Sequence, residues 1–405
     1  WLIGLNFILF GVNEFSLRIW SVVFTILTAL ILYFWGSGIK NYWLGILSAL
    51  VFLSSIQVSI THAGITGDYD AGASFFVSLS LFLFFLFYKT KKGLYWILSV
   101  IAIGLGIMYK SFVPGLLPLV IIAVFLLFSG EFRTIDLKKF FLIALVILVI
   151  VVSPWLIIRS TSDNNFLSSL FGTDYWQRFT TPLDGHGAPF SYYIVQMNQG
   201  FFPWLYFLLP GSIAMYMEIK KRKDKESLLF LVWFFVFLFI FTAAQTKNYW
   251  YILPAFPAMA IIVSGFFVKT MEVISNLESR KLLVPIFIFF TFFNICAAIA
   301  YTEYFFFLHQ DRDHLAFFIK QESVKNELIS VENILISSNL STQSNTLYLK
   351  RLLGDKYIFS TQVTCILNDR ELYLIKADAN FVRKYFEICK ERKIVERYGQ
   401  YVLIK

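Results

Sequence analysis

The chain has 405 residues, of which 58% are hydrophobic and 15% charged, and its mean hydropathy is +0.68. Soluble domains carry about 25% charged residues, so this composition excludes an ordinary soluble domain and indicates a polytopic membrane protein. The net charge of +9 does not indicate a nucleic-acid partner, because the basic residues cluster in short loops between apolar runs.

Ten apolar runs are long enough to be predicted as membrane helices, which need about 17–25 residues. In chain order they are 17–35, 43–60, 71–88, 94–109, 112–128, 140–157, 201–217, 227–243, 250–268 and 283–302. Residues 1–12 are typical of the end of an earlier hydrophobic or interfacial helix. Because the chain begins with Trp1 and shows no signal peptide, we expect an N-terminal piece to precede it.

The loops between these runs alternate in charge. One set carries most of the lysines and arginines and is expected to be cytoplasmic. The other set, together with everything after residue 301, is expected to face the outside. The cations of the first set are Lys40, Lys89, Lys91, Lys92, Arg133, Lys138, Lys139, Lys220, Lys221, Arg222, Lys223, Lys225, Lys269, Arg280 and Lys281, and those of the second are Lys110, Arg159, Arg178 and Lys247.

The segment His62–Ala71, between the second and third predicted helices, is an outer loop that holds Asp68 and Asp70. A carboxylate beside hydrocarbon is costly, and such residues are usually retained for function or held by a partner. The alternative is structural, with Asp70 capping the next helix and Asp68 in solvent.

Three cations belong to the same predicted face. Lys110 follows an apolar run and Lys247 precedes one, so each is either a phosphate ligand or an interfacial anchor. Arg178 lies in the long loop 159–199, where aromatic residues and Gly and Pro turn signals favour an ordered structure. Alone, Arg178 would be an ordinary surface arginine.

Residues 304–405 differ from the rest, because the apolar runs shorten and charges return. We predict a transmembrane domain over residues 1–303 and a small soluble α/β domain over 304–405. The expected elements are strands at Asn333–Ser338 and Glu371–Ala377, helices at Ser344–Leu353 and Asn380–Arg392, and a hairpin over 393–405. Four side chains near its start are candidate metal ligands, although a solvated linker is the more common explanation. They are His309, Asp311, Asp313 and His314.

Acids, cations and aromatic residues at one face of a large hydrophobic body suit transfer from a membrane-anchored phosphate donor. Fixed Lys and Arg side chains would stabilise the charge that develops on a phosphate leaving group. A carboxylate would act as a base or orient the acceptor. The sequence contains no phosphate-binding loop or dinucleotide fingerprint, which makes a nucleotide-sugar donor less attractive.

Five stretches, in order, resemble motifs of the C-type glycosyltransferases, which use polyprenyl-phosphate sugars. The resemblance is to the aminoarabinose–lipid A transferases and the dolichyl-phosphate-mannose–protein mannosyltransferase-like proteins, and it covers residues 1–300. The stretches are Leu9–Arg18, the acid Asp70, Tyr109–Gly115, Gln177–Phe179 with His186–Tyr193, and Thr246–Ala258.

The resemblance implies the C-type glycosyltransferase fold and an enzyme of the cell inner membrane with an extracytoplasmic active site. Its partners would be a polyprenyl-phosphate sugar donor and a lipid A, other glycolipid or protein acceptor. Lys110 and Arg178 would bind phosphate, and Tyr251 would lie near the carrier phosphate. The other candidate substrate-binding residues are His186 and Lys247, and the candidate catalytic acids are Asp70 and Asp68. The resemblance also suggests a divalent metal ion, shared between the acid that orders the site and a loop histidine.

Three departures from the family pattern affect these implications. The family's principal catalytic acid precedes the stretch Leu9–Arg18 and is absent from this sequence. Tyr175 stands where a loop histidine is expected, which weakens the metal hypothesis, and Ser111 replaces a glycine.

Two other functions stay open. One is a transporter or flippase for a lipid-linked anion, and the other is a non-catalytic membrane assembly subunit. Transporters usually place polar groups near the bilayer midplane within repeats, whereas here the unusual polar residues belong to one predicted face.

Overall fold

The computed structural model describes residues 2–11, 14–59, 63–64, 66–131, 137–183, 186–273, 285, 287–297 and 299–300, and the backbone of five strands between residues 333 and 404. The chain folds as two compact units. One comprises Trp1–Phe7 with Asn13–Tyr301, and the other comprises Ile8–Val12 with Thr302–Lys405.

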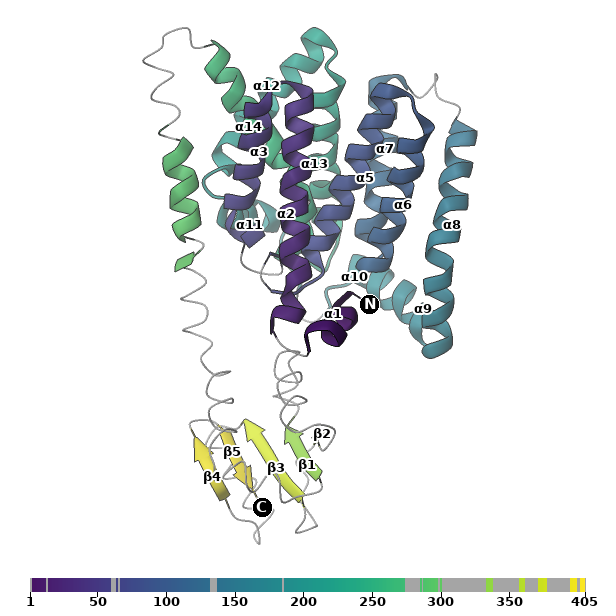
Figure 1. Cartoon of the computed structure of the whole chain (residues 1–405), viewed down its shortest axis with the longest axis vertical. Coiled ribbons are helices and arrows are strands. Elements are labelled where there is room, and N and C mark those ends of the chain that lie inside the picture. The colour runs from purple at the N-terminus through teal and green to yellow at the C-terminus, as the bar shows by residue number, and fades with distance from the viewer. Residues whose placement is uncertain are drawn as a thin grey trace. The chain divides into compact units, whose positions relative to one another are not determined.

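The first unit is helical (Figure 1). After α1 (Leu2–Phe10), which contributes to both units, its elements are α2 (Glu14–Ile39), α3 (Tyr42–Ser54), α4 (Ile56–Ser59), α5 (Asp70–Thr90), α6 (Gly93–Tyr109), α7 (Phe112–Ser129), α8 (Leu137–Ser162), α9 (Phe166–Ser168), the π-helix η2 (Ser169–Gln177), α10 (Arg178–Thr180), α11 (Tyr192–Gly200), α12 (Leu205–Arg222), α13 (Lys225–Ala243), the 3₁₀ helix η3 (Tyr249–Ala255) and α14 (Phe256–Val273).

The apolar runs of the sequence form these helices. Several of the helices end at a residue whose backbone adopts the left-handed conformation. Lys91 (φ 58°) follows α5, Gly130 (φ 76°) follows α7 and Lys223 (φ 54°) follows α12. In each case the backbone amide of the cap bonds to a carbonyl of the last helical turn, which satisfies a group that the helix itself leaves unpaired. These caps end the three helices.

Among the described residues, five helices are long and apolar enough to cross a membrane, or six if one bent pair forms a single span. The five are Phe15–Ile39, Asp70–Thr90, Lys138–Ser162, Lys225–Ala243 and Tyr249–Val273. The bent pair, α11 and α12, turns by 109°. Shorter apolar helices at Tyr42–Ser54, Gly93–Tyr109, Gly115–Ser129 and Phe287–Ala297 coincide with other predicted spans. The chain is therefore a multi-pass membrane protein, while ten crossings stay a prediction.

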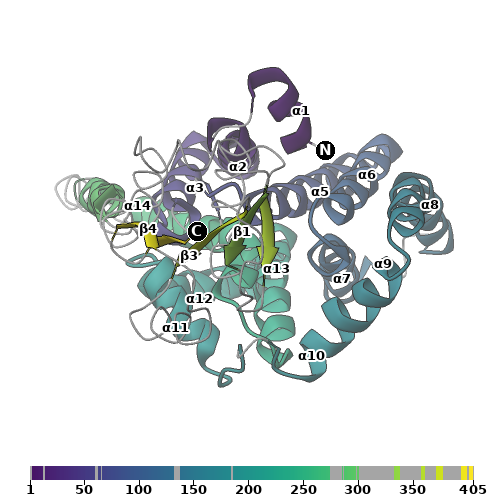
Figure 2. The same cartoon turned by 90° about the horizontal axis from the view of Figure 1, so that it is seen from below.

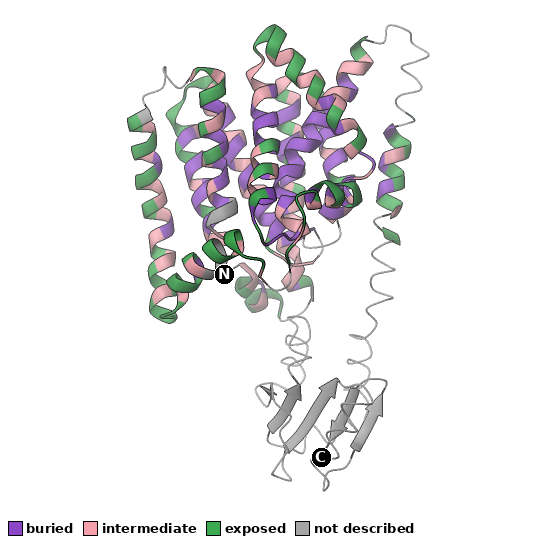
Figure 3. Cartoon of the chain, turned by 180° about the vertical axis from the view of Figure 1, so that it is seen from behind, coloured by how far each residue is buried: buried purple, intermediate pink, exposed green. Residues whose placement is uncertain are grey.

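Burial is uneven across the helices (Figure 3). In the span formed by η3 and α14, 83% of the residues in an 18-residue apolar stretch are buried, whereas in α8 the share is 11%. Trp35 of α2 packs between Phe230 and Trp233 of α13, at ring-centroid distances of 4.9 and 6.1 Å. Seen along the helices, α5, α6, α7 and α8 form one side of the unit (Figure 2). The core therefore centres on α13 and α14, and α8 exposes the apolar surface that suits lipid.

The second unit contains a five-stranded sheet in the order β2-β1-β3-β5-β4. Its strands are β1 (Asn333–Ser337), β2 (Tyr357–Ser360), β3 (Glu371–Lys376), β4 (Ile394–Tyr398) and β5 (Tyr401–Ile404). β1 pairs in parallel with β2 and β3, and β5 pairs antiparallel with β3 and β4. The strands at β1 and β3 and the final hairpin coincide with the prediction, and β2 was not foreseen. The predicted helices and the His309–His314 run lie outside the described residues.

Candidate active site

Asp70 is the first residue of α5, and its carboxylate forms an ion pair with the ammonium of Lys110, the residue that follows α6. The Asp70 side chain is 5% exposed and the Lys110 side chain 19%. Tyr69 occupies the N-cap position of α5, so Asp70 is not the cap that the structural alternative required. Lys110 likewise has an acid partner, which a simple interfacial anchor would not need.

The packing of α5 on α6 brings this pair together. The ring of Tyr109 lies against Gly72, where a Cβ atom would overlap it. The same ring meets Phe24 edge-on at 5.1 Å and Tyr69 at 5.8 Å, measured between ring centroids. A glycine at position 72 therefore lets α6 approach the first turn of α5, and the next residue, Lys110, reaches Asp70.

Tyr251 and Arg178 extend the cluster. Nη1 of Arg178, in α10, donates a hydrogen bond of 3.4 Å to the hydroxyl of Tyr251, in η3. Nζ of Lys110 lies 5.8 Å from the centroid of the Tyr251 ring, within the range of a cation–π contact. Asp70, Lys110, Tyr251 and Arg178 thus form a continuous set of contacts contributed by four elements, which we call the Asp70–Arg178 cluster.

The long loop is fixed next to this cluster by its backbone. Thr246 donates its amide to the carbonyl of Arg178 at 3.0 Å, and the Gln245 amide bonds to Phe179 at 3.1 Å. Gly187 forms an antiparallel bridge with Thr246. The ordered loop expected from its composition is therefore present in the described part, where it positions Arg178.

Lys247 and His186 meet through their main chains, at 2.9 Å between the Lys247 amide and the His186 carbonyl. The Lys247 side chain is buried, and its ammonium donates a hydrogen bond of 2.6 Å to the Ala244 carbonyl. His186 is exposed. Asp68 is half-buried, and its carbonyl accepts a 3.1 Å hydrogen bond from the Ser21 hydroxyl. These bonds to main-chain atoms hold the three candidate residues in the loops around the Asp70–Arg178 cluster.

Two residues that the sequence analysis missed hold η3 in place. Nε2 of Gln57, in α4, donates a hydrogen bond of 2.8 Å to the carbonyl of Tyr249. The Tyr193 hydroxyl donates one of 3.2 Å to the carbonyl of Asn248. Both side chains are buried. A glutamine inside a predicted apolar span was the one available signal, since buried polar groups need partners.

The described residues contain no group of three or more His, Cys, Asp or Glu side chains that could hold a metal ion. Within that part of the chain, Asp70 is engaged by an ammonium group, which competes with a cation for the carboxylate. His62 lies outside the described residues, as does the side chain of Asp174. The divalent ion therefore stays a prediction.

The arrangement suits binding of an anion beside a carboxylate. Arg178 donates to the Tyr251 hydroxyl, and Lys110, which is held by a buried acid, lies over the ring of the same tyrosine. Fixed, partly buried cations stabilise developing negative charge more strongly than cations in water, because the local dielectric is lower. A phosphate group is the anion for which Lys and Arg are the usual ligands.

Known proteins are similar to this chain in sequence and in fold. Residues 1–158 match the dolichyl-phosphate-mannose-protein mannosyltransferase family. The undecaprenyl phosphate-alpha-4-amino-4-deoxy-L-arabinose arabinosyl transferase of Erwinia tasmaniensis is 29% identical over 274 residues, which are 66% of this chain and 48% of that protein. The protein of the same name from Yersinia pestis is 28% identical over 289 residues, or 70% and 50%. The chain thus spans about half the length of the curated relatives it matches.

Solved structures also share the fold. ArnT from Cupriavidus metallidurans, bound to undecaprenyl phosphate, aligns with a TM-score of 0.74 at 14% identity, over all of this chain and 86% of that one. The oligosaccharyltransferase from Archaeoglobus fulgidus aligns with a TM-score of 0.53 at 13% identity, over 89% and 56%. The resemblance expected from the sequence is therefore confirmed: the chain has the C-type glycosyltransferase fold and resembles the aminoarabinose transferases.

Proposed function

We propose that this chain is part of a membrane glycosyltransferase that moves a sugar from a polyprenyl-phosphate carrier to a lipid-linked or protein acceptor. The observation that carries the proposal is the Asp70–Arg178 cluster, in which residues from four elements place two cations around one phenol. Relatives that share the fold include a structure bound to undecaprenyl phosphate. A carrier phosphate fits both observations.

In the proposed reaction, an acceptor oxygen bonds to the anomeric carbon as the bond from that carbon to the carrier phosphate breaks. The phosphate oxygen leaves with the bonding electrons, and the acceptor proton passes to a base. Lys110 and Arg178 would neutralise the leaving phosphate, because both are held in place before the charge develops. Inversion at the anomeric carbon is expected from a direct displacement.

Asp70 has a positioning role in this proposal. Its carboxylate is already engaged by the Lys110 ammonium, so it is not the proposed base. It is, however, well placed to hold Lys110 in one orientation. Asp68 is proposed as a second carboxylate near the acceptor, and His186, Lys247 and Tyr251 as substrate-binding residues.

We further propose that the site faces the extracytoplasmic side of the cell inner membrane and that residues 304–405 form a soluble extracytoplasmic domain. Asp70, Lys110 and Tyr251 all belong to one end of their helices, which is the end with few cations. Lys40, Lys89 and the other clustered cations belong to the opposite ends. Such an asymmetry marks the cytoplasmic side.

The function is tested with the full protein in nanodiscs, supplied with radiolabelled undecaprenyl-phosphate sugars, with and without a membrane lipid extract. Carrier phosphate released only when an acceptor is present is the expected result, and the fraction that supports release identifies the acceptor class. If no donor in a broad panel is bound or cleaved, the chain is better explained as a transporter or an assembly subunit.

A further inference from the structure

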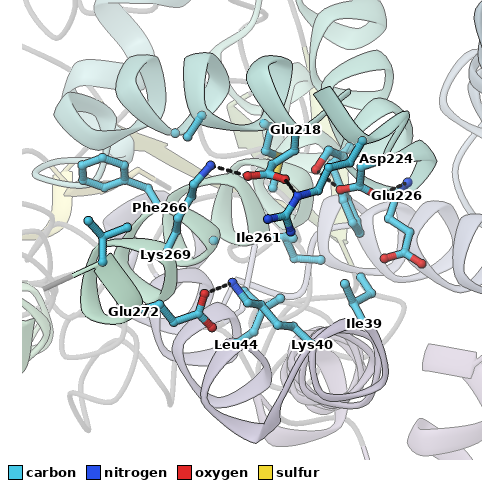
Figure 4. Close-up of a pocket in the computed structure, with 18 residues that line it drawn as sticks. Ile39, Lys40, Leu44, Glu218, Asp224, Glu226, Ile261, Phe266, Lys269 and Glu272 are labelled. Atoms are coloured by element: carbon cyan, nitrogen blue, oxygen red, sulfur yellow. Dashed lines mark hydrogen bonds and ion pairs between the residues drawn. The ribbon is translucent and has the colours of Figure 1, made fainter. Parts of the chain in front are cut away.

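A pocket lies away from the Asp70–Arg178 cluster, at the C-terminal ends of α2, α12 and α14 and the start of α13 (Figure 4). Its volume is about 540 Å³. Phe256, the first residue of α14, and Lys269, in the pocket wall, are 13 residues apart on one helix. At 1.5 Å per residue the separation is about 20 Å, so Lys269 lies far along α14 from the candidate active site.

Charged side chains of both signs surround the mouth of this pocket. Glu218 of α12 binds Lys269 of α14 at 2.5 Å and Arg222 at 3.3 Å. Lys40, after α2, pairs with Glu272 of α14 at 2.7 Å. With Asp224 and Glu226, the lining has four carboxylates and three cations. It is therefore suited to a ligand with both charges rather than to a simple anion.

These ion pairs can exchange partners at low cost. The side chains of Arg222 and Glu272 are 79% and 51% exposed, and those of Lys40 and Lys269 are both 36% exposed. Exposed ion pairs contribute little to stability, because water screens the charges. A ligand that supplies its own ammonium and phosphate could replace them without leaving a charge unpaired.

The floor of the pocket is apolar. Leu44, Phe230 and Ile261 line it and are at most 4% exposed. The space thus connects a charged mouth, at the ends of membrane helices, with the hydrophobic core of the helical unit. This combination fits an amphiphile, whose hydrocarbon part lies on apolar side chains while its polar part meets the charged ones.

We propose that this pocket binds a zwitterionic phospholipid whose headgroup carries one phosphate and one primary ammonium. The phosphate would contact the cations of the mouth, and the ammonium would donate hydrogen bonds to Glu218 or Glu272. A quaternary ammonium has no N–H to donate and is usually recognised by aromatic cages, so a choline headgroup fits these carboxylates less well. An anionic headgroup would take the cations from Glu218 and Glu272 and offer these two carboxylates no ammonium in return.

The test is native mass spectrometry of the full protein titrated with phosphatidylethanolamine, phosphatidylcholine or phosphatidylglycerol. We expect phosphatidylethanolamine to bind at least tenfold more tightly than the other two. Free phosphoethanolamine forms a fourth arm and should bind far more weakly, because it lacks the hydrocarbon part. Equal affinity for the three lipids, preference for either competitor, or equal binding of free phosphoethanolamine would overturn the proposal.

Two variants locate the binding site. Glu218→Gln with Glu272→Gln should lower phosphatidylethanolamine affinity at least tenfold, and Ala214→Phe, which fills the pocket without changing its charge, should do the same. Glu131→Gln is the matched control: Glu131 pairs with Lys225 at 2.7 Å and is not among the lining residues. Unchanged affinity in folded Ala214→Phe protein contradicts the assignment even if the double variant does not fold. None of these measurements depends on transferase activity.

Discussion

The contact between Asp70 and Lys110 is the residue-scale feature on which the candidate site depends. Both side chains are largely removed from water, and each compensates for the cost of burying the other. A carboxylate in this position limits the rotamers of the lysine. The pair therefore preorganises one cation for a phosphate before any substrate arrives.

Replacing one partner should be worse for stability than replacing both. Asp70→Asn or Lys110→Met alone leaves a buried charge without its partner, at a cost of about 3 kcal/mol, the lower end of the range for buried pairs because Lys110 is partly exposed. The double variant should regain most of that loss while remaining inactive. The free energy of unfolding of each variant is measured with denaturant in detergent. If the loss in the double variant equals the sum of the two single losses, the two residues are not coupled.

The Tyr251 hydroxyl should contribute to turnover through Arg178. Tyr251→Phe keeps the ring and its 5.5 Å contact with Phe241 but removes the 3.4 Å hydrogen bond from Arg178. A hydrogen bond to a charged group is worth about 1.5–3 kcal/mol, and the long distance places this one near the lower limit, so we expect about a tenfold drop in kcat. Tyr216→Phe, at an exposed tyrosine, is the control. A normal kcat in the Tyr251→Phe protein would show that the hydroxyl does not contribute to turnover.

At the scale of elements, helix lengths explain why Asp70 and Lys110 meet. α5 has 21 residues and α6 has 17, and Lys91 and Lys92 join them. At 1.5 Å per residue the chain returns to within about 6 Å of its starting level, a gap that the lysine side chain covers. An apolar hairpin of these lengths thus places two charges 40 residues apart at one end of the bundle.

The 3₁₀ helix η3 depends on side chains from other elements. Gln57 and Tyr193 donate to consecutive carbonyls at its start, and Nε1 of Trp233 donates 3.0 Å to the carbonyl of Pro254 near its end. These bonds set the direction in which Tyr251 leaves the backbone. We regard Gln57 as a positioning residue, because its contact with the site is through η3.

Gln57→Met should therefore impair transfer although the residue does not touch the cluster. Methionine keeps the volume but leaves the Tyr249 carbonyl without this donor, at a cost of about 1–3 kcal/mol. We expect kcat to fall several-fold and the additional effect of Tyr251→Phe to shrink in the Gln57→Met background. Full additivity of the two substitutions, measured as kcat in a double-mutant cycle, would indicate a purely structural role for Gln57.

At the scale of the whole molecule, the sequence was informative where the signal is local. Apolar runs predicted the helices, and Asp70 and Lys110 stood out individually because each is a charge at the end of such a run. The contact of Arg178 with Tyr251, 73 residues away, depends on the backbone bonds from Gln245 and Thr246 to Phe179 and Arg178, which no periodicity marks. The bonds of Gln57 and Tyr193 end on main-chain carbonyls, which have no sequence signature.

The central claim is that fixed cations at the Asp70–Arg178 cluster act on a carrier phosphate. The most direct test is acceptor-dependent release of carrier phosphate by Lys110→Ala and Arg178→Ala protein, with Lys92→Ala as the control. Lys92 is an exposed lysine at the opposite end of the same helix as Lys110. We predict that turnover falls about 10²–10³-fold in each site variant, as for loss of a preorganised charge-stabilising group, and is unchanged in Lys92→Ala. A folded Lys110→Ala, Arg178→Ala double variant with full turnover would contradict this claim.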